Sequence, residues 1–343
     1  MHIGFYNHTK AFNKNRMFLD PNSWFGDNLV YPFVFLGTQL KKMGHKVNTI
    51  DMDKLENFDA IVFIEFPGIN NPYFKKLIKN DFKNIYLIAQ ESPIIKPDNL
   101  DTKNHAHFKK VFTWNDPVID NKKYFKLNYS HDIPKTFNFK TDKKNKLCTI
   151  IAGNKLAKHQ GELYSERVKA IRWFERHHLE DFDLFGIGWD RYNFHGTFLG
   201  INIARLNRLT FLTKLLKPNY PSYKGKVKSK NETYKKYKFS ICYENVRDIE
   251  GYITEKIFDC FLAGCVPIYL GASNITDHIP SNTFIDKRNF DTYEKLYSYI
   301  KNMPDKDYLD HINNIKLFLT SQKAYPFSAQ YFADTIIKQI TNE

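Results

Sequence analysis

The chain of 343 residues suits two domains of about 150 to 200 residues each, a length that excludes a peptide-sized or disulfide-stapled scaffold. Hydrophobic residues make up 42% of the chain and aromatic residues 16%, so it has the apolar mass that intrinsically disordered proteins lack. The net charge of +14 is concentrated in residues 201–240, which hold eleven Lys or Arg and one acidic residue, and this indicates an anionic partner: nucleotide phosphate, nucleic acid or a lipid surface.

The sequence contains no segment typical of membrane insertion or secretion. Its longest apolar runs, such as residues 60–64, fall short of the roughly 20 residues of a membrane span. The first seven residues read as a strand and lack the regions of a secretory signal, which predicts a cytoplasmic protein. The cysteines show neither metal-ligand spacing nor a Cys-x-x-Cys pair, so buried reduced thiols are expected at Cys148, Cys242, Cys260 and Cys265.

The first half of the chain alternates between strand-length and helix-length segments. Short β-branched or aromatic runs are separated by polar-interrupted helical patterns such as residues 31–43 and 72–80. The predicted strands cover residues 2–7, 46–50, 60–65, 84–89 and 110–114. This alternation predicts an open parallel sheet covered by helices.

A second strand series follows a lysine-rich segment, residues 131–146, that contains Pro134 and has weak apolar periodicity. The predicted strands cover residues 147–152, 182–186, 239–243, 266–270 and 283–285. The expected fold class is α/β, with two Rossmann-like, doubly wound domains facing each other across a cleft where the carboxyl ends of the strands bind ligands. The predicted units are residues 1–140, residues 141–325 and a C-terminal segment, residues 326–343, in a single helix that packs back on the first domain.

The densest group of polar residues lies in one strand-turn-helix segment. An apolar strand ends at Asn245, a turn follows at Gly251, and a helix is predicted to begin near Thr254. Free N–H groups and the helix dipole at such a point favour an anion such as a diphosphate. The residues placed there are Tyr252, Glu255 and Lys256. The alternative is structural, because an acidic residue in the first turn is a common cap and a neighbouring lysine is commonly solvated.

Four short motifs follow one another between residues 237 and 271: Tyr-Lys-Phe, Glu-Asn, Gly-Tyr-Ile-Thr-Glu-Lys and Ala-Gly-Cys-Val-Pro-Ile-Tyr-Leu-Gly. In sequence and spacing they resemble the donor-binding signature of glycosyltransferase family 10, the α-1,3/4-fucosyltransferases. The resemblance is close over residues 220–290 and weaker over residues 84–94 and 147–190. It implies a GT-B fold in which the first domain binds the acceptor and the second binds a GDP-sugar.

The resemblance also implies roles for individual residues. Asn245 and Tyr252 match family residues that hold the guanosine diphosphate portion of GDP-fucose. Lys256 matches a residue that contacts the phosphates, and Glu255 matches one at the fucose ring. A Ser-Glu-Arg-Val motif resembles the family segment whose arginine binds the diphosphate, and Arg167 is the counterpart of that arginine. The planar guanidinium can bind phosphate oxygens bidentately, although a lone arginine on a helix is more often a surface residue.

The general base is expected in the first domain. A Glu-Ser-Pro motif at the end of a predicted strand resembles the family segment that contains the proposed base, which assigns this role to Glu91. A carboxylate fixed at a strand end suits proton abstraction from an acceptor hydroxyl. Some bacterial family members carry a further acidic residue two places earlier, where this chain has Ala89. The alternative is that Glu91 is a solvated residue at the rim of the cleft.

The implied reaction passes through an oxocarbenium-like transition state, with positive charge on the ring and negative charge on the leaving diphosphate. Arg167, Lys256 and the helix N-terminus would stabilise the diphosphate, so no metal or other cofactor is expected. Asp51-Met52-Asp53 superficially resembles the Asp-x-Asp metal motif of other glycosyltransferases. It lies far from the donor segment, and carboxylates after a strand usually begin turns or cap helices.

The basic region begins with an amphipathic pattern over residues 203–217, in which leucines alternate with Arg205, Arg208, Lys214 and Lys217. This pattern predicts a basic amphipathic helix that can lie on an anionic membrane surface, as a peripheral contact of residues 201–240 at the inner face of the membrane. The alternative is an insertion that packs its apolar face on its own domain and leaves the basic side chains in solvent.

The implied function is that of an inverting glycosyltransferase that moves L-fucose from GDP-β-L-fucose to a hydroxyl, expected to be O3, of N-acetylglucosamine or glucose in an oligosaccharide or glycolipid. An exposed aromatic in residues 22–27 could stack on the acceptor sugar, or the segment could equally be a turn that packs Trp24 into the core. One alternative is a different GDP-sugar, and another is a transferase fold that only binds glycans. A nucleic-acid-binding protein is disfavoured, because no known module and no base-stacking aromatics accompany the charges.

Overall fold

The computed structural model describes residues 1–22, 27–194, 197–198 and 201–341. The N-terminal half contains a six-stranded, fully parallel sheet in the order β2-β1-β3-β4-β5-β6. Its strands and main helices are β1 (His2–Asn7), α1 (Tyr31–Lys42), β2 (Lys46–Thr49), β3 (Ala60–Ile64), α2 (Pro72–Lys79), β4 (Ile85–Ala89), β5 (Lys110–Thr113) and β6 (Tyr124–Lys126). The short edge strand β6 was not predicted from the sequence.

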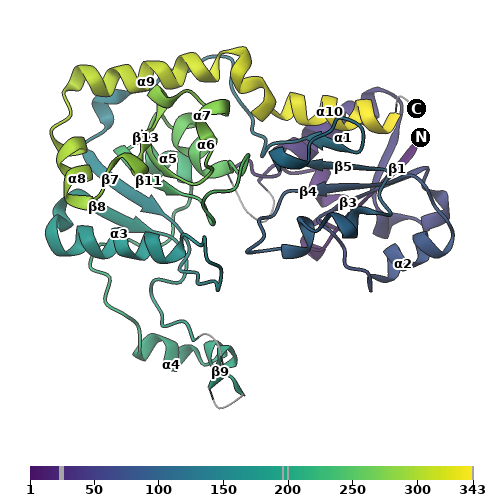
Figure 1. The fold of residues 1–343 in the computed structure, drawn as a ribbon, viewed down its shortest axis with the longest axis horizontal. Helices are drawn as coiled ribbons and strands as arrows, with labels where there is room; N and C mark the ends of the chain where they lie inside the picture. The colour runs from purple at the N-terminus through teal and green to yellow at the C-terminus, as the bar shows by residue number, and fades with distance from the viewer. Residues whose placement is uncertain (23–26, 195–196, 199–200, 342–343) are drawn as a thin grey trace.

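The C-terminal half contains a second parallel sheet, of five strands in the order β13-β12-β11-β7-β8. Its elements are β7 (Lys146–Ile151), α3 (Tyr164–His177), β8 (Phe182–Phe185), α5 (Lys230–Tyr234), β11 (Tyr237–Tyr243), α6 (Glu255–Leu262), β12 (Val266–Leu270), α7 (Ile275–His278), β13 (Ile285–Asp286), α8 (Tyr293–Lys301) and α9 (Asp305–Leu319). The two sheets confirm the predicted α/β class with two doubly wound, Rossmann-like units (Figure 1).

Both sheets change direction of winding next to their first strand. The chain passes from β1 to β2 on one side and then to β3 on the other, and it likewise passes from β7 to β8 and then to β11. The carboxyl ends of the strands beside such a switch point form the usual ligand crevice of doubly wound folds. In this chain both sets of strand ends contribute residues to one cleft between the halves.

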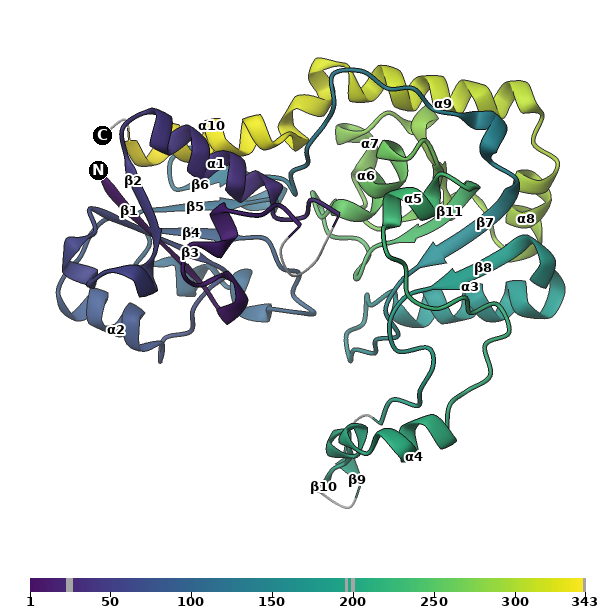
Figure 2. The ribbon, with the colours of Figure 1, turned by 180° about the vertical axis from the view of Figure 1, so that it is seen from behind.

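The C-terminus of the chain returns to the N-terminal sheet. Helix α10 (Ala329–Thr341) packs against α1, where the Phe33 and Phe332 rings lie 5.1 Å apart, and its apolar face joins the core of the first sheet. Figures 1 and 2 show α9 over one half of the molecule and α10 over the other. The expected C-terminal helix is present as α10, but it begins only at Ala329, after a 3-10 helix that contains Pro326 and after the extended Ser328. The domain boundaries at residues 140 and 325 stay predictions.

A polar cluster joins the two halves. Asp116, which follows β5, accepts hydrogen bonds from Asn274 Nδ2 at 2.9 Å and Lys126 Nζ at 2.5 Å, and its carboxylate lies 2.8 Å from His278 Nε2. Burial opposes ionisation of Asp116, but the contacts with His278, Lys126 and Asn274 outweigh it and hold the pKa of Asp116 below its usual value. The ionised carboxylate therefore bridges β6 and α7.

The buried thiols match the sequence expectation, because all four cysteines are buried and unpaired. They lie in the core of the C-terminal sheet, where burial raises the pKa of Cys148, Cys260 and Cys265 well above the usual value. A thiol with a raised pKa is a poor nucleophile and metal ligand. These side chains therefore act as small apolar packing groups.

Residues 203–217, the first part of the basic region, belong to an arm and do not form one helix. Figures 1 and 2 show β9 (Thr197–Phe198), β10 (Ile201–Asn202) and α4 (Thr210–Leu215) projecting from the C-terminal half, away from both sheets. The predicted continuous helix is interrupted at Leu209, which lies between a 3-10 helix (Ile203–Arg208) and α4. Isolated short helices are marginal in water, and the apolar side chains that the described part of the arm leaves exposed do not supply the packing that would extend them. The arm leaves four large apolar side chains 48% to 79% exposed: Leu209, Phe211, Leu215 and Leu216.

Candidate active site

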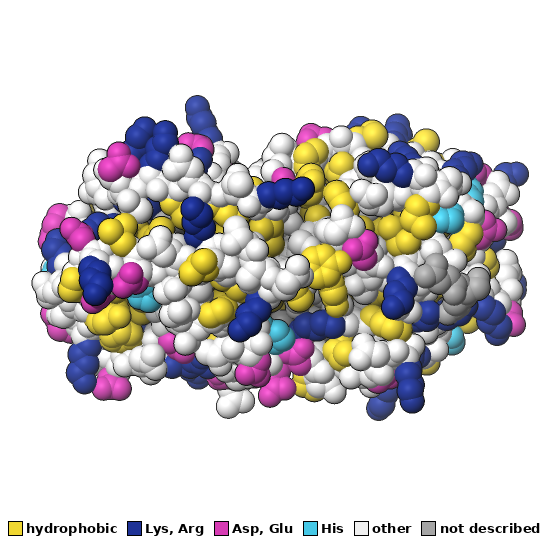
Figure 3. All heavy atoms as spheres, turned by 90° about the horizontal axis from the view of Figure 1, so that it is seen from above, with side chains coloured by type: hydrophobic (Ala, Val, Ile, Leu, Met, Phe, Trp, Pro, Cys, Tyr) yellow, Lys and Arg dark blue, Asp and Glu magenta, His cyan; other side chains and the backbone are white. Residues whose placement is uncertain are grey.

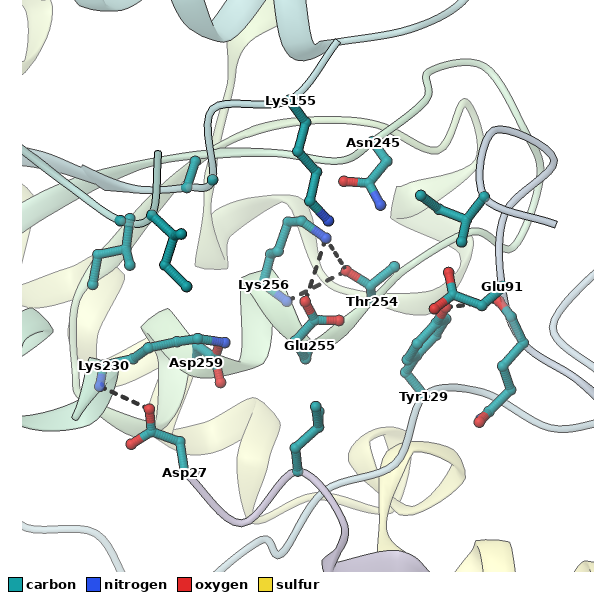
Figure 4. Close-up of a pocket in the computed structure, with 18 of the residues that line it drawn as sticks. Asp27, Glu91, Tyr129, Lys155, Lys230, Asn245, Thr254, Glu255, Lys256 and Asp259 are labelled. Carbon is teal, nitrogen blue, oxygen red and sulfur yellow. Dashed lines mark hydrogen bonds and ion pairs between the residues drawn. The ribbon is translucent and has the colours of Figure 1, made fainter. Parts of the chain in front are cut away.

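A cleft of about 1240 Å³ lies between the two halves and contains all six residues that the sequence predicted for the site. They come from separate strand ends and helix starts: Glu91, Arg167, Asn245, Tyr252, Glu255 and Lys256. The close-up in Figure 4 shows Glu91 and Tyr129 on one side of the cleft and the start of α6 facing them. The tertiary structure therefore brings the expected base together with the expected donor residues.

A buried carboxylate anchors the start of α6. Glu244, whose side chain is 0% exposed, accepts hydrogen bonds from Thr254 N at 2.8 Å and from Thr254 Oγ1 at 2.7 Å. Lys256 Nζ donates to Glu244 Oε2 at 3.1 Å and to Thr254 Oγ1 at 2.9 Å. Burial alone would lower the pKa of Lys256, but Glu244 and Glu255 outweigh it and raise that pKa. The raised pKa keeps Lys256 charged, and this charge offsets the energetic cost of burying the Glu244 carboxylate.

Glu255 is the first residue of α6 and lies beside Lys256, with 3.4 Å between Glu255 Oε1 and Lys256 Nζ. Burial would raise the pKa of Glu255, but the positive charges of Lys256 and Lys230 outweigh it and lower the pKa to about 2. Glu255 is therefore ionised at neutral pH. A fixed negative charge at this point can stabilise positive charge that develops on a bound sugar ring.

Arg167, on α3, holds the end of β11. Its Nη2 donates to the carbonyl oxygens of Tyr243 at 2.6 Å and Glu244 at 2.7 Å, and to Asn245 Oδ1 at 3.1 Å. The side chain is only 5% exposed. Arg167 thus orients the loop that carries Asn245 while lining the cleft, and its contact with a diphosphate stays a prediction.

Tyr252 is packed between the two halves. It is 1% exposed, its ring centre lies 4.9 Å from that of Trp114, and its hydroxyl accepts a hydrogen bond from Asn245 Nδ2 at 3.4 Å. Gly251, just before it, has φ of +77°, and a Cβ there would lie 2.2 Å from the Trp114 carbonyl oxygen. Only glycine fits this turn. The close approach explains why the predicted turn at Gly251 brings the donor segment against the N-terminal half.

Glu91 follows β4 and projects into the cleft (Figure 4). Burial raises the pKa of Glu91, the charge of Glu255 raises it further, and Lys256 and Lys155 lower it. A carboxylate with a raised pKa is a stronger base toward a hydroxyl proton. The two acidic residues of the cleft thus have different environments, one that keeps Glu255 ionised and one that favours proton uptake by Glu91.

Two cations in the cleft were missed by sequence reasoning. Lys155, four residues after the end of β7, points toward Lys256 and Asn245 (Figure 4). Lys230, the first residue of α5, pairs with Asp259 at 2.8 Å. Position after a strand end was the available indication for Lys155, whereas Lys230 was hidden among the many lysines of the basic region.

A contact across the cleft involves Asp27 of the N-terminal half. Its carboxylate accepts hydrogen bonds from Ser229 Oγ at 2.8 Å and Lys230 N at 2.9 Å. Burial raises the pKa of Asp259, the ion-pair partner of Lys230, to about 6 even though the charge of Lys230 lowers this pKa. Asp259 lies one helical turn after Glu255 on α6, a spacing that would have indicated a shared face. Residues 23–26 of the expected acceptor segment lie outside the described residues.

Asp51 and Asp53 have structural partners. Asp51 Oδ2 accepts from Lys14 N at 2.9 Å, and Asp53 accepts from Lys54 N at 2.8 Å and Lys46 Nζ at 3.2 Å. In the described ranges, no group of three or more His, Cys, Asp or Glu is placed to hold a metal ion. The independence from metal stays a prediction.

Comparisons with known proteins agree with the motif-based resemblance. Residues 212–322 match the family model of glycosyltransferase family 10 (fucosyltransferase), C-terminal part. The chain is 34% identical over 101 residues to an α-(1,3)-fucosyltransferase of Helicobacter pylori, covering 29% of this chain and 21% of that protein. It is 42% identical over 69 residues to an α-(1,4)-fucosyltransferase of Arabidopsis thaliana, covering 20% of this chain and 17% of that protein. The matched part thus spans about a fifth of these relatives.

Similarity in structure extends over the whole chain. A crystal structure of an α1,3-fucosyltransferase aligns over 100% of this chain and 90% of its own with a TM-score of 0.58 and 15% identity. An α-glucosyltransferase in complex with UDP and DNA aligns over 98% and 99% with a TM-score of 0.55 and 10% identity. These similarities show that the fold is of the GT-B type. The family match itself covers residues 212–322, which are similar to the C-terminal part of glycosyltransferase family 10, the fucosyltransferases.

Proposed function

We propose that this protein is an inverting glycosyltransferase that transfers L-fucose from GDP-β-L-fucose to the O3 hydroxyl of N-acetylglucosamine or glucose in an oligosaccharide or glycolipid. The observation that carries the proposal is the cleft in which Glu91 faces the helix start with Glu255 and Lys256. The family match of residues 212–322 covers that helix start, and a solved structure of the same fold was determined with GDP-fucose.

The donor diphosphate would bind at the start of α6. Lys256, Arg167 and Lys155 supply positive charge there, and Asn245 supplies a hydrogen-bonding amide. Among the described hydrogen bonds of Lys256 Nζ, the 3.4 Å contact with Glu255 is the longest, so a phosphate oxygen could replace it. The N-terminal end of a helix adds partial positive charge for the same anion.

The chemistry follows from this placement. The acceptor hydroxyl gives its proton to Glu91 while its oxygen forms a bond to the anomeric carbon of fucose. The bond from that carbon to the phosphate oxygen breaks, and its electron pair leaves with GDP. Attack from the face opposite GDP inverts the anomeric centre. Glu255 would stabilise the positive charge on the ring, and Lys256 and Arg167 the negative charge on the diphosphate.

Titration calorimetry with GDP, GDP-L-fucose and GDP-mannose, first without metal and then with Mn²⁺, tests the donor. We expect micromolar binding of GDP and GDP-fucose without metal, because the Lys and Arg side chains of the cleft supply the positive charge that a metal ion would provide. Lys155→Ala should weaken GDP binding about 10-fold, since an ion pair with phosphate in a partly enclosed site contributes on the order of 1.4 kcal/mol. Lys158→Ala, an exposed change in the same loop, is the control.

Each alternative has its own outcome in this experiment. Tighter binding of GDP-mannose than GDP-fucose would indicate another donor sugar, and GDP-fucose binding without transfer to any acceptor would indicate a glycan-binding protein. Salt-sensitive binding of nucleic acid without GDP binding would favour a nucleic-acid-binding protein. On the face seen in Figure 3, Lys and Arg lie apart from one another with Asp and Glu between them, rather than in one basic stripe.

We also propose that the arm makes a peripheral contact with an anionic membrane. The apolar side chains of Phe211 and Leu215 are 79% and 67% exposed, and residues 203–217 carry four basic and no acidic residues. Exposed apolar groups flanked by cations suit the interface of an anionic bilayer. In the described part of the chain, no helix is long and apolar enough to cross a bilayer.

Vesicle flotation tests the membrane contact. The protein should float with vesicles that contain phosphatidylglycerol and remain in solution with pure phosphatidylcholine. Phe211→Ser with Leu215→Ser should reduce the bound fraction at least 10-fold, because each buried side chain contributes about 1.5–3 kcal/mol. The matched control changes two exposed apolar residues elsewhere, Leu309→Ser and Leu317→Ser. Equal flotation of both double variants would contradict the contact.

A further inference from the structure

We propose that Glu65 is a positioning residue that fixes the general base Glu91 for proton abstraction, an inference that rests on the proposed fucosyl transfer. Glu65 follows β3, and β3 is the neighbour of β4, whose end carries Glu91. Both residues line the cleft. No motif in the sequence indicated Glu65, because it lies outside the regions that resemble the family.

Glu65 holds the backbone at the end of β4 through its carboxylate. Its oxygens accept hydrogen bonds from Glu91 N at 3.2 Å and from Gln90 N at 3.3 Å and 3.4 Å. The Glu65 backbone N–H also donates to the Ile88 carbonyl at 2.8 Å, which continues the strand pairing beyond β3. The Glu65 side chain thereby continues the hydrogen bonding between the two segments beyond the end of the β-ladder.

The same peptide unit is held from its other side. The carbonyl of Gln90 and the N–H of Glu91 belong to one peptide group. That carbonyl accepts hydrogen bonds from Trp114 Nε1 at 2.5 Å and from the Tyr129 hydroxyl at 2.7 Å. Because a peptide group is planar, fixing its oxygen and its nitrogen fixes the orientation of the plane and the direction in which the Glu91 side chain leaves the backbone.

Glu65 is itself held in place by a buried amide. Asn99, which is 1% exposed, donates from Nδ2 to Glu65 Oε2, and its Oδ1 accepts from Phe66 N at 2.9 Å. The Asn99 carbonyl in turn lies 3.0 Å from His105 Nε2, a side chain that is 3% exposed. The carboxylate therefore has a defined orientation rather than the freedom of a solvated side chain.

The backbone and the charge of Glu65 both indicate a specialised position. Its φ is +66°, in the left-handed region that a residue with a side chain rarely adopts. Burial raises the pKa of Glu65 to about 7, with the Asn99 hydrogen bond lowering it and the charge of Glu91 raising it. In the described part of the chain, the side-chain hydrogen-bond partners of Glu65 are N–H groups rather than cations. A strained acidic residue that orients a neighbouring peptide fits a positioning role better than a role in stability.

The test is the variant Glu65→Gln, which keeps the size of the side chain and places an amide where two carboxylate oxygens accept hydrogen bonds. We expect kcat for fucosyl transfer to fall 10- to 100-fold while the KM for GDP-fucose and the Kd for GDP change less than 2-fold. Hydrogen exchange of the Gln90 and Glu91 amides should accelerate at least 10-fold, with the β4 amides unchanged. Glu56→Gln, an exposed glutamate of the same half, is the matched control.

The outcomes separate this inference from the proposed function. Wild-type protein that binds GDP-fucose but transfers no fucose to any acceptor contradicts the transferase function and, with it, the role assigned to Glu65. An active wild type with a variant of equal kcat, or with unchanged exchange at residues 90 and 91, contradicts the role of Glu65 alone.

If Glu65→Gln does not fold, Tyr129→Phe removes one donor from the opposite end of the same peptide and should lower kcat about 3- to 10-fold at constant KM. An unchanged kcat in that variant would overturn the proposal.

Discussion

Glu91→Gln is expected to lower kcat for fucosyl transfer by about 10²- to 10⁴-fold, the usual contribution of a general base. The amide keeps the shape of the side chain but cannot take the proton from the acceptor hydroxyl. Donor binding should change little, because the donor residues come from the other half of the molecule. The measurement is initial rates over a range of acceptor concentrations, together with calorimetric binding of GDP.

The pH profile gives a second view of the same residue. The raised pKa of Glu91 places the acid limb of kcat/KM above pH 4.5, the ordinary value for this carboxyl, so activity is lost as pH falls through the raised pKa. Asp98→Asn removes a carboxylate from an exposed position close to Glu91 in sequence and should keep the rate and the limb. A Glu91→Gln variant as fast as the wild type would exclude Glu91 as the base.

Lys256→Ala is expected to have the largest effect on stability. It removes the ion-pair partner of Glu244, whose side chain is 0% exposed, so this buried carboxylate loses the cation that contacts it. Breaking a buried ion pair in this way costs about 3–5 kcal/mol in the free energy of unfolding. GDP affinity should fall at least 10-fold, because the same ammonium group is proposed to bind the diphosphate. Urea unfolding and calorimetry measure the two effects.

Two further variants show whether the ion pair is the cause. Lys238→Ala breaks a pair with Asp305, whose side chain is 86% exposed, and should cost less than about 1 kcal/mol. The double variant Glu244→Gln with Lys256→Met removes both charges and should recover a large part of the lost stability but not the GDP affinity. If Lys256→Ala unfolds at the same urea concentration as the wild type, the buried pair does not stabilise the donor segment.

The strand-turn-helix segment of the site could be predicted from the sequence because its signals are local. The strand, the turn at Gly251 and the helix that begins after Thr254 follow one another within about 20 residues, so alternation, a glycine and a capping residue define them. The Thr254 side chain does accept a hydrogen bond from Lys256 N, as an N-cap does. The start of α6 therefore follows from residue types in sequence order.

The packing partners of the site residues could not be predicted from local sequence patterns. Glu244 directly precedes Asn245, the expected end of the strand, and only the fold shows that its buried carboxylate pairs with Lys256. Asp27 and Lys230 meet across the cleft although about 200 residues separate them. Such contacts depend on how the two sheets are placed against each other, and the hydrophobic periodicity of the chain does not specify that placement.

The sequence by itself determined the α/β class and nearly all strands of the two sheets, and it supplied the predictions of the donor segment and of Glu91 as the base. These follow from periods of 2 and 3.6 residues and from short motifs, which are local properties. The tertiary structure decided which strand ends share a cleft, that α10 returns to the first sheet, and that residues 203–217 belong to an arm and do not form one helix. It also decided that Glu65 holds the peptide of Glu91. The reason is physical: hydrogen bonds and burial between distant segments depend on the packing of whole layers, which local patterns do not specify.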